Sequence, residues 1–258
     1  MELTRSTDAF VTGGASGLGL GIADALAARG LRITIADILP DLLENSLSQR
    51  SECFNGVSLD VRDRAGWQRA KEEAEARFGP VDILINNAGI APDGRPFADM
   101  NPESFDRVLG VNLVGVANGV FAFADSMRSR GRGHIVNTAS VGGLSPPGPG
   151  LGGYAVAKYG VVALSETLRD ELAPYGVGVS VLCPDYVVTG LGENTIRIGG
   201  ELSMIGRTPP STDVTSADVG EKVVSGIERN AAYIFTHHDS WLPIEQRMRK
   251  IEEACRLV

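Results

Sequence analysis

The stretch that decides the fold is Thr12-Gly13-Gly14-Ala15-Ser16-Gly17-Leu18-Gly19, near the start of the chain. It joins a short predicted strand, Ala9-Phe10-Val11, to a helical pattern that runs through Ala28. Glycine permits a tight turn at Gly13 and close approach of a pyrophosphate to bare backbone at Gly17, while Gly19 lets the helix pack closely on the sheet. The N–H groups and the dipole at the helix start favour an anion. A glycine cluster alone is equally a turn and packing device, so its context must decide.

A carboxylate follows at the offset that a dinucleotide site needs. Asp37 ends the next predicted strand, 18 residues beyond Gly19, and the acid that binds the adenosine ribose lies about 20 residues beyond the glycines. A carboxylate there repels a 2′-phosphate, and Ser16 and Ile38 add no cation that would hold one. Asp37 could instead cap a helix or end a strand in solvent. With the glycines before it, we expect ribose recognition, and therefore NAD in preference to NADP.

The composition is that of an acidic globular protein. The 258 residues include 24 Lys+Arg and 32 Asp+Glu, for a formal net charge of −8, and 43% of them are hydrophobic. This excludes disorder as the bulk state and leaves no electrostatic footprint for nucleic acid or an anionic membrane surface. We find no run of about 18 apolar residues and no secretory signal, and so expect a cytoplasmic protein with no membrane span.

The three cysteines show no metal-ligand spacing. Cys53, Cys183 and Cys255 are odd in number and far apart, so we expect reduced thiols and no metal site. Cys183 ends a predicted strand, and no histidine is placed in sequence to activate it, so we interpret it as a packing residue.

Apolar runs alternate with amphipathic stretches to the end of the chain. The pattern predicts the α/β class: one doubly wound, Rossmann-type parallel sheet in three αβα layers, a single domain over residues 1–258. Two segments, 142–153 and about 189–211, break the alternation; we expect active-site loops there, the second being the substrate-binding loop. The predicted strands are 9–11, 32–37, 57–59, 81–85, 135–138, 177–182 and 233–235, and the predicted later helices are 41–49, 64–78, 102–130, 154–174, 217–229 and 243–256.

Four motifs occur in the order seen in one enzyme family. They are the glycine stretch, Asn86-Asn87-Ala88-Gly89, Ser140 and Tyr154-Ala155-Val156-Ala157-Lys158. In them the chain resembles the short-chain dehydrogenases/reductases, specifically the compact single-domain branch, and the resemblance covers essentially the whole chain. The TGxxxGxG glycine spacing favours this branch over the longer one that modifies sugar nucleotides. The resemblance implies an NAD(P)-dependent oxidoreductase.

The chemistry of the last motif can be derived from its residues. Tyr154 and Lys158 are four residues apart, so on a helix they share one face. A free tyrosine has a pKa of about 10, and a neighbouring ammonium, together with the positive nicotinamide ring of NAD⁺, favours the phenolate. Such a pair can take the proton of an alcohol while hydride leaves the same carbon. The alternative, a solvated Tyr and Lys, is common for an isolated YxxxK.

Two further catalytic positions and several coenzyme contacts come from the resemblance. It implies that Ser140, at a strand end, holds the substrate oxygen, with Ser145 as a weaker candidate, and that Asn112 holds a proton-relay water; the alternatives are a turn cap for Ser140 and a kink-stabilising residue for Asn112. It also implies that Asp60 bonds the adenine amino group, although Asp60 could cap the following helix. The coenzyme-binding set, which combines these arguments, is Gly13, Ser16, Gly17, Leu18, Gly19, Asp37, Asp60, Val61, Asn87, Ala88, Gly89, Tyr154, Lys158, Pro184, Val187 and Thr189.

Two positions depart from the family pattern. Where the family usually has Pro-Gly, this chain has Pro184-Asp185, which places an extra carboxylate near the substrate or in solvent. The interval of 14 residues between Ser140 and Tyr154 is about one longer than the resemblance implies, and the addition falls within 146–150. We expect it to reshape one wall of the pocket.

We therefore expect an NAD(H)-dependent enzyme that interconverts a secondary alcohol and a ketone, on a hydrophobic or aryl-bearing substrate. The alternatives are an NADPH-dependent ketoreductase of an acyl-thioester-type ketone and a non-catalytic nucleotide-binding sensor. The family also implies a homo-oligomer, a tetramer or dimer, built through helices 102–130 and 154–174. The side chains expected to line an apolar substrate pocket are Leu144, Leu151, Tyr186, Val187, Leu191, Ile196, Ile198 and Met204.

Overall fold

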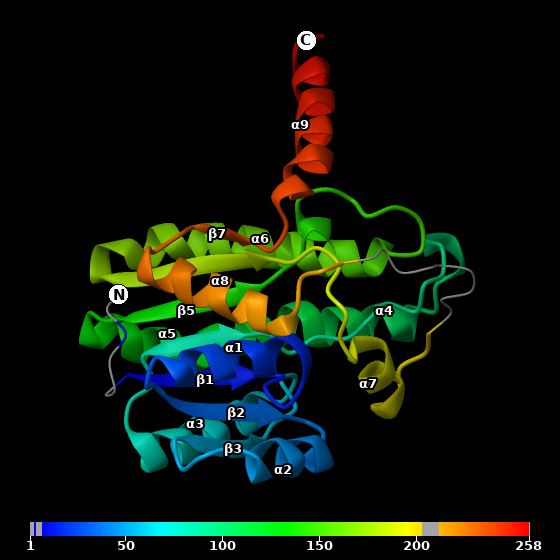
Figure 1. The fold of residues 1–258 in the computed structure, drawn as a ribbon. Helices are drawn as coiled ribbons and strands as arrows, with labels where there is room; N and C mark the ends of the chain where they lie inside the picture. Colours follow the sequence, from blue (N-terminus) through cyan, green and yellow to red (C-terminus); the bar gives the residue numbers. More distant parts are fainter. Residues whose placement is uncertain (1–2, 4–6, 203–211, 258) are drawn as a thin grey trace.

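The computed structural model describes residues 3, 7–202 and 212–257, which fold around a seven-stranded parallel sheet (Figure 1). The strand order is β3-β2-β1-β4-β5-β6-β7, so the direction of winding reverses between β1 and β4. In such sheets ligands bind at this reversal, outside the carboxyl ends of the strands. The strands are β1 (Asp8–Thr12), β2 (Arg32–Asp37), β3 (Phe54–Ser58), β4 (Ile83–Asn86), β5 (Gly133–Thr138), β6 (Val177–Cys183) and β7 (Tyr233–Phe235).

Helices cover both faces of the sheet, as the alternating sequence pattern predicts. On β1, Phe10 points to one face, into a core it shares with Trp67 and Phe123, while Ala9 and Val11 point to the opposite core. The first core is covered by α3 (Arg64–Phe78), α4 (Pro102–Leu109), α5 (Gly115–Arg130) and α6 (Gly152–Leu172), and the second by α1 (Gly17–Ala28), α2 (Pro40–Ser48) and α8 (Ser216–Glu228).

The predicted helix 102–130 is interrupted. A π-helical turn, Gly110–Val114, lies between α4 and α5, and the buried Asn112 within it bonds the backbone of Ile90 through both ends of its amide. Pro102–Arg130 is also long and apolar enough to cross a membrane by length and composition, contrary to our expectation that no such segment exists. Half of its most apolar 18-residue window is buried inside the fold, because α5 packs against the sheet, so its apolar character has a core-packing explanation.

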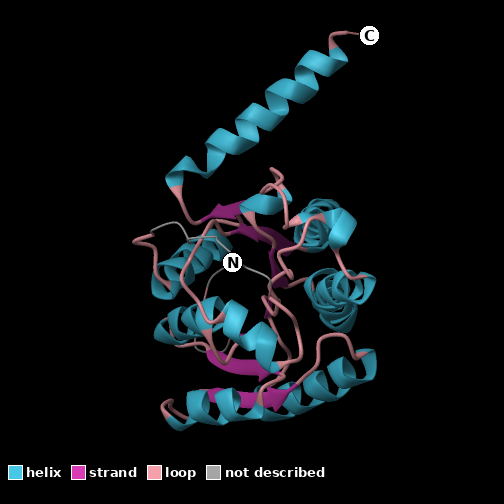
Figure 2. Cartoon of the chain, turned by 90° about the vertical axis from the view of Figure 1, so that its right-hand side faces the viewer, coloured by secondary structure: helices cyan, strands magenta, loops and turns pink. Residues whose placement is uncertain are grey.

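Two other differences concern segments near the site. Helix α7 (Leu191–Arg197) forms in the segment expected to be a loop, because its stability comes from contacts with distant residues rather than from periodicity. The last helix, α9 (Trp241–Cys255), begins two residues before the predicted 243 and stands away from the rest of the molecule (Figure 2).

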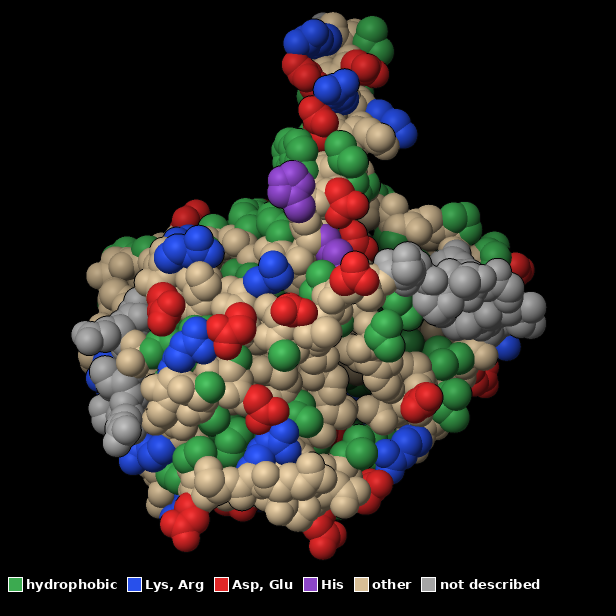
Figure 3. All heavy atoms as spheres, in the orientation of Figure 1, with side chains coloured by type: hydrophobic (Ala, Val, Ile, Leu, Met, Phe, Trp, Pro, Cys, Tyr) green, Lys and Arg blue, Asp and Glu red, His purple; other side chains and the backbone are tan. Residues whose placement is uncertain are grey.

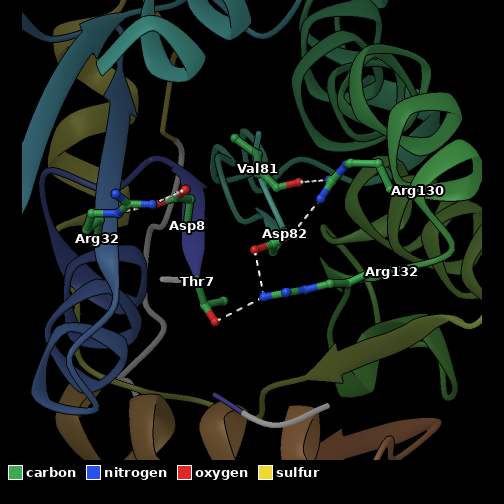
Figure 4. A network of polar contacts seen from close by, with 7 residues as sticks. All are labelled: Thr7, Asp8, Arg32, Val81, Asp82, Arg130 and Arg132. Atoms are coloured by element: carbon green, nitrogen blue, oxygen red, sulfur yellow. Dashed lines mark hydrogen bonds and ion pairs between the residues drawn. The ribbon is translucent and has the colours of Figure 1, made fainter. Parts of the chain in front are cut away.

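The amino ends of the strands are held by an ionic network (Figure 4). The buried carboxylate of Asp8 pairs with Arg32 at 2.6 Å, and buried Asp82 pairs with Arg130 at 2.6 Å and Arg132 at 3.0 Å. These residues begin or directly precede β1, β2, β4 and β5, or end α5. The network joins neighbouring strands at the edge of the sheet opposite the carboxyl ends, where the motif residues lie.

Candidate active site

A cavity of about 650 Å³ lies at the carboxyl ends of the strands. It runs from the glycine turn after β1, past the ends of β2 and β4, to the segments after β5 and β6. Apart from Gly19, every residue predicted to bind coenzyme lines it, and so do the predicted catalytic residues Ser140, Tyr154 and Lys158. Long-range folding therefore brings four separate motifs of the sequence to one cleft.

The glycine turn has the geometry that its sequence predicts. Gly13 and Gly17 adopt left-handed φ values of +60° and +54°, which favour glycine. Gly19 lies behind the turn: a Cβ there would be 2.1 Å from the Gly13 carbonyl oxygen. Since α1 begins at Gly17, the N–H groups of its first turn lack intrahelical partners, and Gly17 and Leu18 line the cavity at this point. This arrangement fits a pyrophosphate.

Asp37 lies at the end of β2 with its carboxylate largely buried. It accepts hydrogen bonds from the N–H groups of Ala15 at 3.2 Å and Leu39 at 3.1 Å. Burial raises its pKa, and these backbone bonds oppose that rise. The side chain is thus held rigidly between the glycine turn and the next loop, as a ribose-binding acid would be. Arg197 lies near enough to lower the pKa of Asp37, but its guanidinium is paired with Asp41 at 2.5 Å.

Asp60 and Val61 follow β3 and line the same part of the cavity. The Asp60 carboxylate pairs with Arg62 at 2.6 Å, which lowers its pKa. The cap of the following helix is Asp63, whose side chain accepts the N–H of Ala65. The alternative interpretation of Asp60 as the helix cap is therefore wrong, and its carboxylate faces the cleft with Arg62 beside it.

The turn after β4 is fixed against the glycine turn. Thr12 Oγ1 accepts the N–H groups of Asn87 at 2.9 Å and Ala88 at 3.1 Å, and the Asn87 amide donates to the Thr12 carbonyl at 3.0 Å. A Cβ at Gly13 would lie 2.9 Å from Ala88 Cα. The Asn-Asn-Ala-Gly motif therefore sets the floor of the cleft at the reversal of the sheet.

Ser140, Tyr154 and Lys158 meet at the other end of the cavity. The Ser140 hydroxyl accepts the Gly142 N–H at 3.1 Å and donates to the Pro184 carbonyl at 3.3 Å. Lys158 is buried, donates to the Thr138 carbonyl at 2.7 Å, and its Nζ lies 5.5 Å from the centre of the Tyr154 ring. The i, i+4 spacing on α6 produces the expected shared face. Ser140 is a turn cap, and its role in holding the substrate oxygen stays a prediction.

Burial dominates the electrostatics of this group. It raises the pKa of the Tyr154 phenol, and a hydrogen bond with Ser140 only partly opposes this. It lowers the pKa of Lys158 to about 8. We expected the ammonium to lower the pKa of Tyr154, but in the protein alone the pKa is raised by burial, and the group that opposes this rise is Ser140. The phenol is therefore a proton donor at neutral pH.

The other predicted residues fall in several places. Asn112 is outside the cavity lining, and its side chain holds Ile90, so its contacts show the kink-stabilising role and the relay role stays a prediction. Asp185 is exposed at the cavity edge and accepts the Tyr186 N–H at 2.8 Å. Cys183 is fully buried, and burial raises the pKa of its thiol to about 12, as suits a packing residue.

The substrate end is mostly as predicted. Leu151, Tyr186, Val187, Leu191 and Ile198 line it, together with Ser145 and the prolines of the lengthened loop, Pro146 and Pro147. Leu144 packs instead into a core cluster, and Ile196 is 57% exposed on the outer side of α7. Met204 lies outside the described residues.

Four positions that shape the cleft carry no signal in the sequence. The short helix α7 is tied across it: Asn194 donates to Ser16 Oγ at 3.1 Å, and the buried Thr195 accepts the Ala91 N–H at 2.9 Å. Arg107 of α4 lines the cavity and donates to the Gly199 carbonyl, and Pro243 of α9 lines it from the far end of the chain. The seven residues of α7 are too few for a periodic signal, which explains why this helix was missed.

Comparisons with known proteins agree with this geometry. The family model described as short chain dehydrogenase matches residues 7–197. The Cα-dehydrogenase of Sphingobium sp. strain SYK-6 is 32% identical over 263 residues, which cover 95% of this chain and 85% of that protein. The levodione reductase of Leifsonia aquatica is 36% identical over 201 residues, 75% of each chain.

Among solved structures, a short-chain dehydrogenase/reductase from Burkholderia phymatum in complex with NAD has a TM-score of 0.88 and 32% identity, covering 98% of this chain and 97% of that one. The chain therefore belongs to the short-chain dehydrogenase/reductase family. As a member it is an NAD(P)-binding oxidoreductase of the class that interconverts alcohols and ketones.

Proposed function

We propose that this protein is an NAD(H)-dependent enzyme that interconverts a secondary alcohol and a ketone bearing hydrophobic or aryl groups. The observation that carries the proposal is the convergence of Ser140, Tyr154 and Lys158 at one end of a cavity whose other end is the glycine turn and Asp37. Acid/base groups and a dinucleotide cradle are thus parts of one continuous cleft.

The residues present fit a dinucleotide coenzyme. The turn at Gly13 and Gly17 leaves backbone bare where a pyrophosphate would lie, and Asp37 is aligned for ribose hydroxyls. When bound, the nicotinamide ring supplies or accepts the hydride. Asp60 and Val61 would hold the adenine, and Thr189, which lies against Gly17, would reach the carboxamide end.

The preference for NAD rests on the charge at Asp37. Its carboxylate would repel a 2′-phosphate, and Arg197, the cation nearby, is already paired with Asp41. A structural neighbour that binds NADPH, the actinorhodin polyketide ketoreductase, has a TM-score of 0.78 and 30% identity. Because of this neighbour, an NADPH-dependent ketoreductase is the second candidate function. A measured preference for NAD or NADP would distinguish it from the NAD-dependent alcohol dehydrogenase.

Tyr154 would transfer the proton to or from the substrate oxygen, and Ser140 and Lys158 would assist this transfer. Its raised pKa suits donation to a ketone oxygen at neutral pH. In the direction of alcohol oxidation the same residue must first lose its proton, so that rate should rise with pH. Ser140 would hold the substrate oxygen, and Lys158, fixed by the Thr138 carbonyl, would place positive charge beside the phenol ring.

The substrate class follows from the walls of the cleft. The substrate end is built from Leu151, Tyr186, Pro146, Pro147 and Pro243, which favour an apolar or aromatic group over a sugar phosphate. Asp185 lies at the rim, bonded to the next N–H and exposed to solvent. It therefore leaves the apolar interior of the pocket unaltered.

The test is initial-rate reduction of NAD⁺ and NADP⁺ with a panel of secondary alcohols from small aliphatic to bulky aryl and polyol. Tyr154→Phe should lower kcat by about 10²–10⁴-fold while the variant still binds NADH. Tyr175→Phe removes an exposed phenol on the turn that follows α6 and should match the wild type. Turnover of polyols alone would refute the apolar substrate, and tight NADH binding with no turnover would support the sensor alternative.

Cytoplasmic location and homo-oligomer formation are also part of the proposal. The helices expected to form the contact carry exposed apolar side chains: Val114 is 41% exposed, Phe121 70% and Val156 46%. They lie on the π-helical turn, α5 and α6. Phe121→Glu should lower the number of chains per particle in sedimentation velocity, and an unchanged particle would contradict this contact.

A further inference from the structure

The peptide unit between Pro184 and Asp185 is held on both sides. Its carbonyl accepts the Val141 N–H at 3.0 Å and the Ser140 hydroxyl at 3.3 Å. Its N–H donates to Thr236 Oγ1 at 3.0 Å. Because a peptide unit is planar, with its C=O and N–H pointing in opposite directions, a contact that holds the N–H also sets the direction of the carbonyl. The bond to Thr236 therefore helps to decide where the Ser140 hydroxyl points.

This peptide lies where the chain departs from the family pattern. Asp185 lines the cavity, and its backbone lies outside the left-handed region that favours glycine. The parallel pairing of β6 with β7 ends just before it, at Cys183 and Phe235. Beyond the end of this ladder, the acceptor for the Asp185 N–H is a side chain, that of the buried Thr236.

His237 holds that side chain. His237 and His238 follow β7, and histidine side chains are visible at the base of the extended helix α9 (Figure 3). The half-buried His237 ring bridges two threonines: Nδ1 lies 2.8 Å from Thr236 Oγ1, and Nε2 lies 2.9 Å from Thr212 Oγ1. Thr212 Oγ1 also accepts the Val214 N–H at 3.1 Å, shortly before α8. The ring is therefore fixed at both nitrogens.

Both neutral forms of this imidazole orient the Thr236 hydroxyl. A neutral imidazole donates at one nitrogen and accepts at the other. When Nε2 donates to Thr212, Nδ1 accepts the hydroxyl hydrogen of Thr236, which leaves a lone pair of Oγ1 for the Asp185 N–H. In the other tautomer, Oγ1 accepts both the Asp185 N–H and the Nδ1 hydrogen. In each case His237 keeps the Thr236 oxygen facing the peptide.

We propose that His237 is a positioning residue for the catalytic site: through Thr236 it holds the Pro184–Asp185 peptide, whose carbonyl orients the Ser140 hydroxyl. A serine held in this way can redirect its hydrogen to a substrate oxygen without moving its own oxygen. Proton transfer stays with Tyr154. The proposal rests on the proposed function, because Ser140 is assigned there to the substrate oxygen.

The experiment compares two substitutions that each keep one contact of the ring. His237→Asn keeps a polar group near the position of Nδ1, which faces Thr236, and His237→Gln keeps one near Nε2, which faces Thr212. His238→Asn changes the neighbouring exposed histidine and is the matched control. All three variants should bind NADH. His237→Gln should lower kcat about tenfold to hundredfold, and kcat/KM by the same factor, whereas His237→Asn and the control stay within about twofold of the wild type.

A double-mutant cycle tests whether His237 acts through Ser140. In a Ser140→Ala background, His237→Gln should lower kcat by no more than a further factor of about two, because the hydroxyl that it positions is already gone. A full multiplicative loss in the double variant would overturn the proposal. So would an equal loss in the Asn and Gln variants, or wild-type kcat in His237→Gln.

Amide hydrogen exchange at Asp185, followed by NMR, gives a readout that needs no turnover. Exchange should be several-fold faster in His237→Gln and in Thr236→Val than in the wild type, and unchanged in His237→Asn and His238→Asn. The same rate in all five proteins would overturn the proposal. A wild type that turns over no alcohol or ketone would refute the proposed function, while the exchange rates would still show whether His237 holds this peptide.

Discussion

Gly19 and Gly21 provide a matched pair of perturbations on one helix. A Cβ at Gly19 would lie 2.1 Å from the Gly13 carbonyl oxygen, and a Cβ at Gly21 would lie 2.2 Å from the Ser216 carbonyl oxygen. Both contacts are with backbone, and both need a shift of about 1 Å to reach an ordinary contact distance. Only the first would displace the proposed pyrophosphate cradle; the second would displace the start of α8 from α1.

The stability cost of the two alanine variants should be similar. Overpacking costs about 1–3 kcal/mol, and the better helix propensity of alanine returns up to about 1 kcal/mol. A net loss of about 1–2 kcal/mol corresponds to a fall in Tm of about 2–8 °C for a chain of this size. Differential scanning calorimetry of both variants measures this.

Coenzyme binding should separate them. We expect Gly19→Ala to weaken NADH binding at least about tenfold, or 1.4 kcal/mol, by fluorescence titration, whereas Gly21→Ala binds as the wild type does. Equal binding by wild type and Gly19→Ala would refute the assignment of this turn to the pyrophosphate. An equal loss in both variants would show that helix packing, rather than the turn, determines affinity.

Two further predictions concern buried ionisable groups. Burial lowers the pKa of His134 to about 3, below the unfolded value of about 6.5, so the unfolded chain binds more protons than the folded protein between pH 3 and 6.5. The free energy of unfolding should therefore fall by up to about 1.4 kcal/mol per pH unit as pH drops through that window. Urea titrations of His134→Gln should show a shallower fall, and parallel curves for the variant and the wild type would contradict this cause. Asp37→Ser removes the charged acceptor proposed for the ribose hydroxyls, whose hydrogen bonds are worth about 1.5–3 kcal/mol. The kcat/KM for NAD⁺ should therefore fall about tenfold or more, while the kcat/KM for NADP⁺ rises. An unchanged ratio of the two kcat/KM values would refute the role of Asp37 in coenzyme choice.

Much of the fold and of the site could be predicted because the deciding residues are close together in sequence. The glycine turn, the offset to Asp37 and the i, i+4 pair of Tyr154 and Lys158 each lie within one βαβ unit or one helix, where spacing determines geometry. The alternating pattern likewise predicted the parallel sheet, since each strand and helix carries its own periodicity. The family assignment and the α/β fold, both confirmed, depend on these local features.

The features of the site that only the tertiary structure shows depend on contacts between distant residues and on burial. The sequence pattern does not show that Asn194 and Thr195 hold α7 across the cleft. Nor does it show that the Asn112 side-chain amide is hydrogen-bonded to the Ile90 backbone, or that Pro243 lines the cavity. The pKa of Tyr154 is another example: the sequence shows a neighbouring cation, but only the fold shows how completely the phenol is removed from water. Desolvation and long-range packing arise when segments far apart in the chain meet, so no local pattern encodes them.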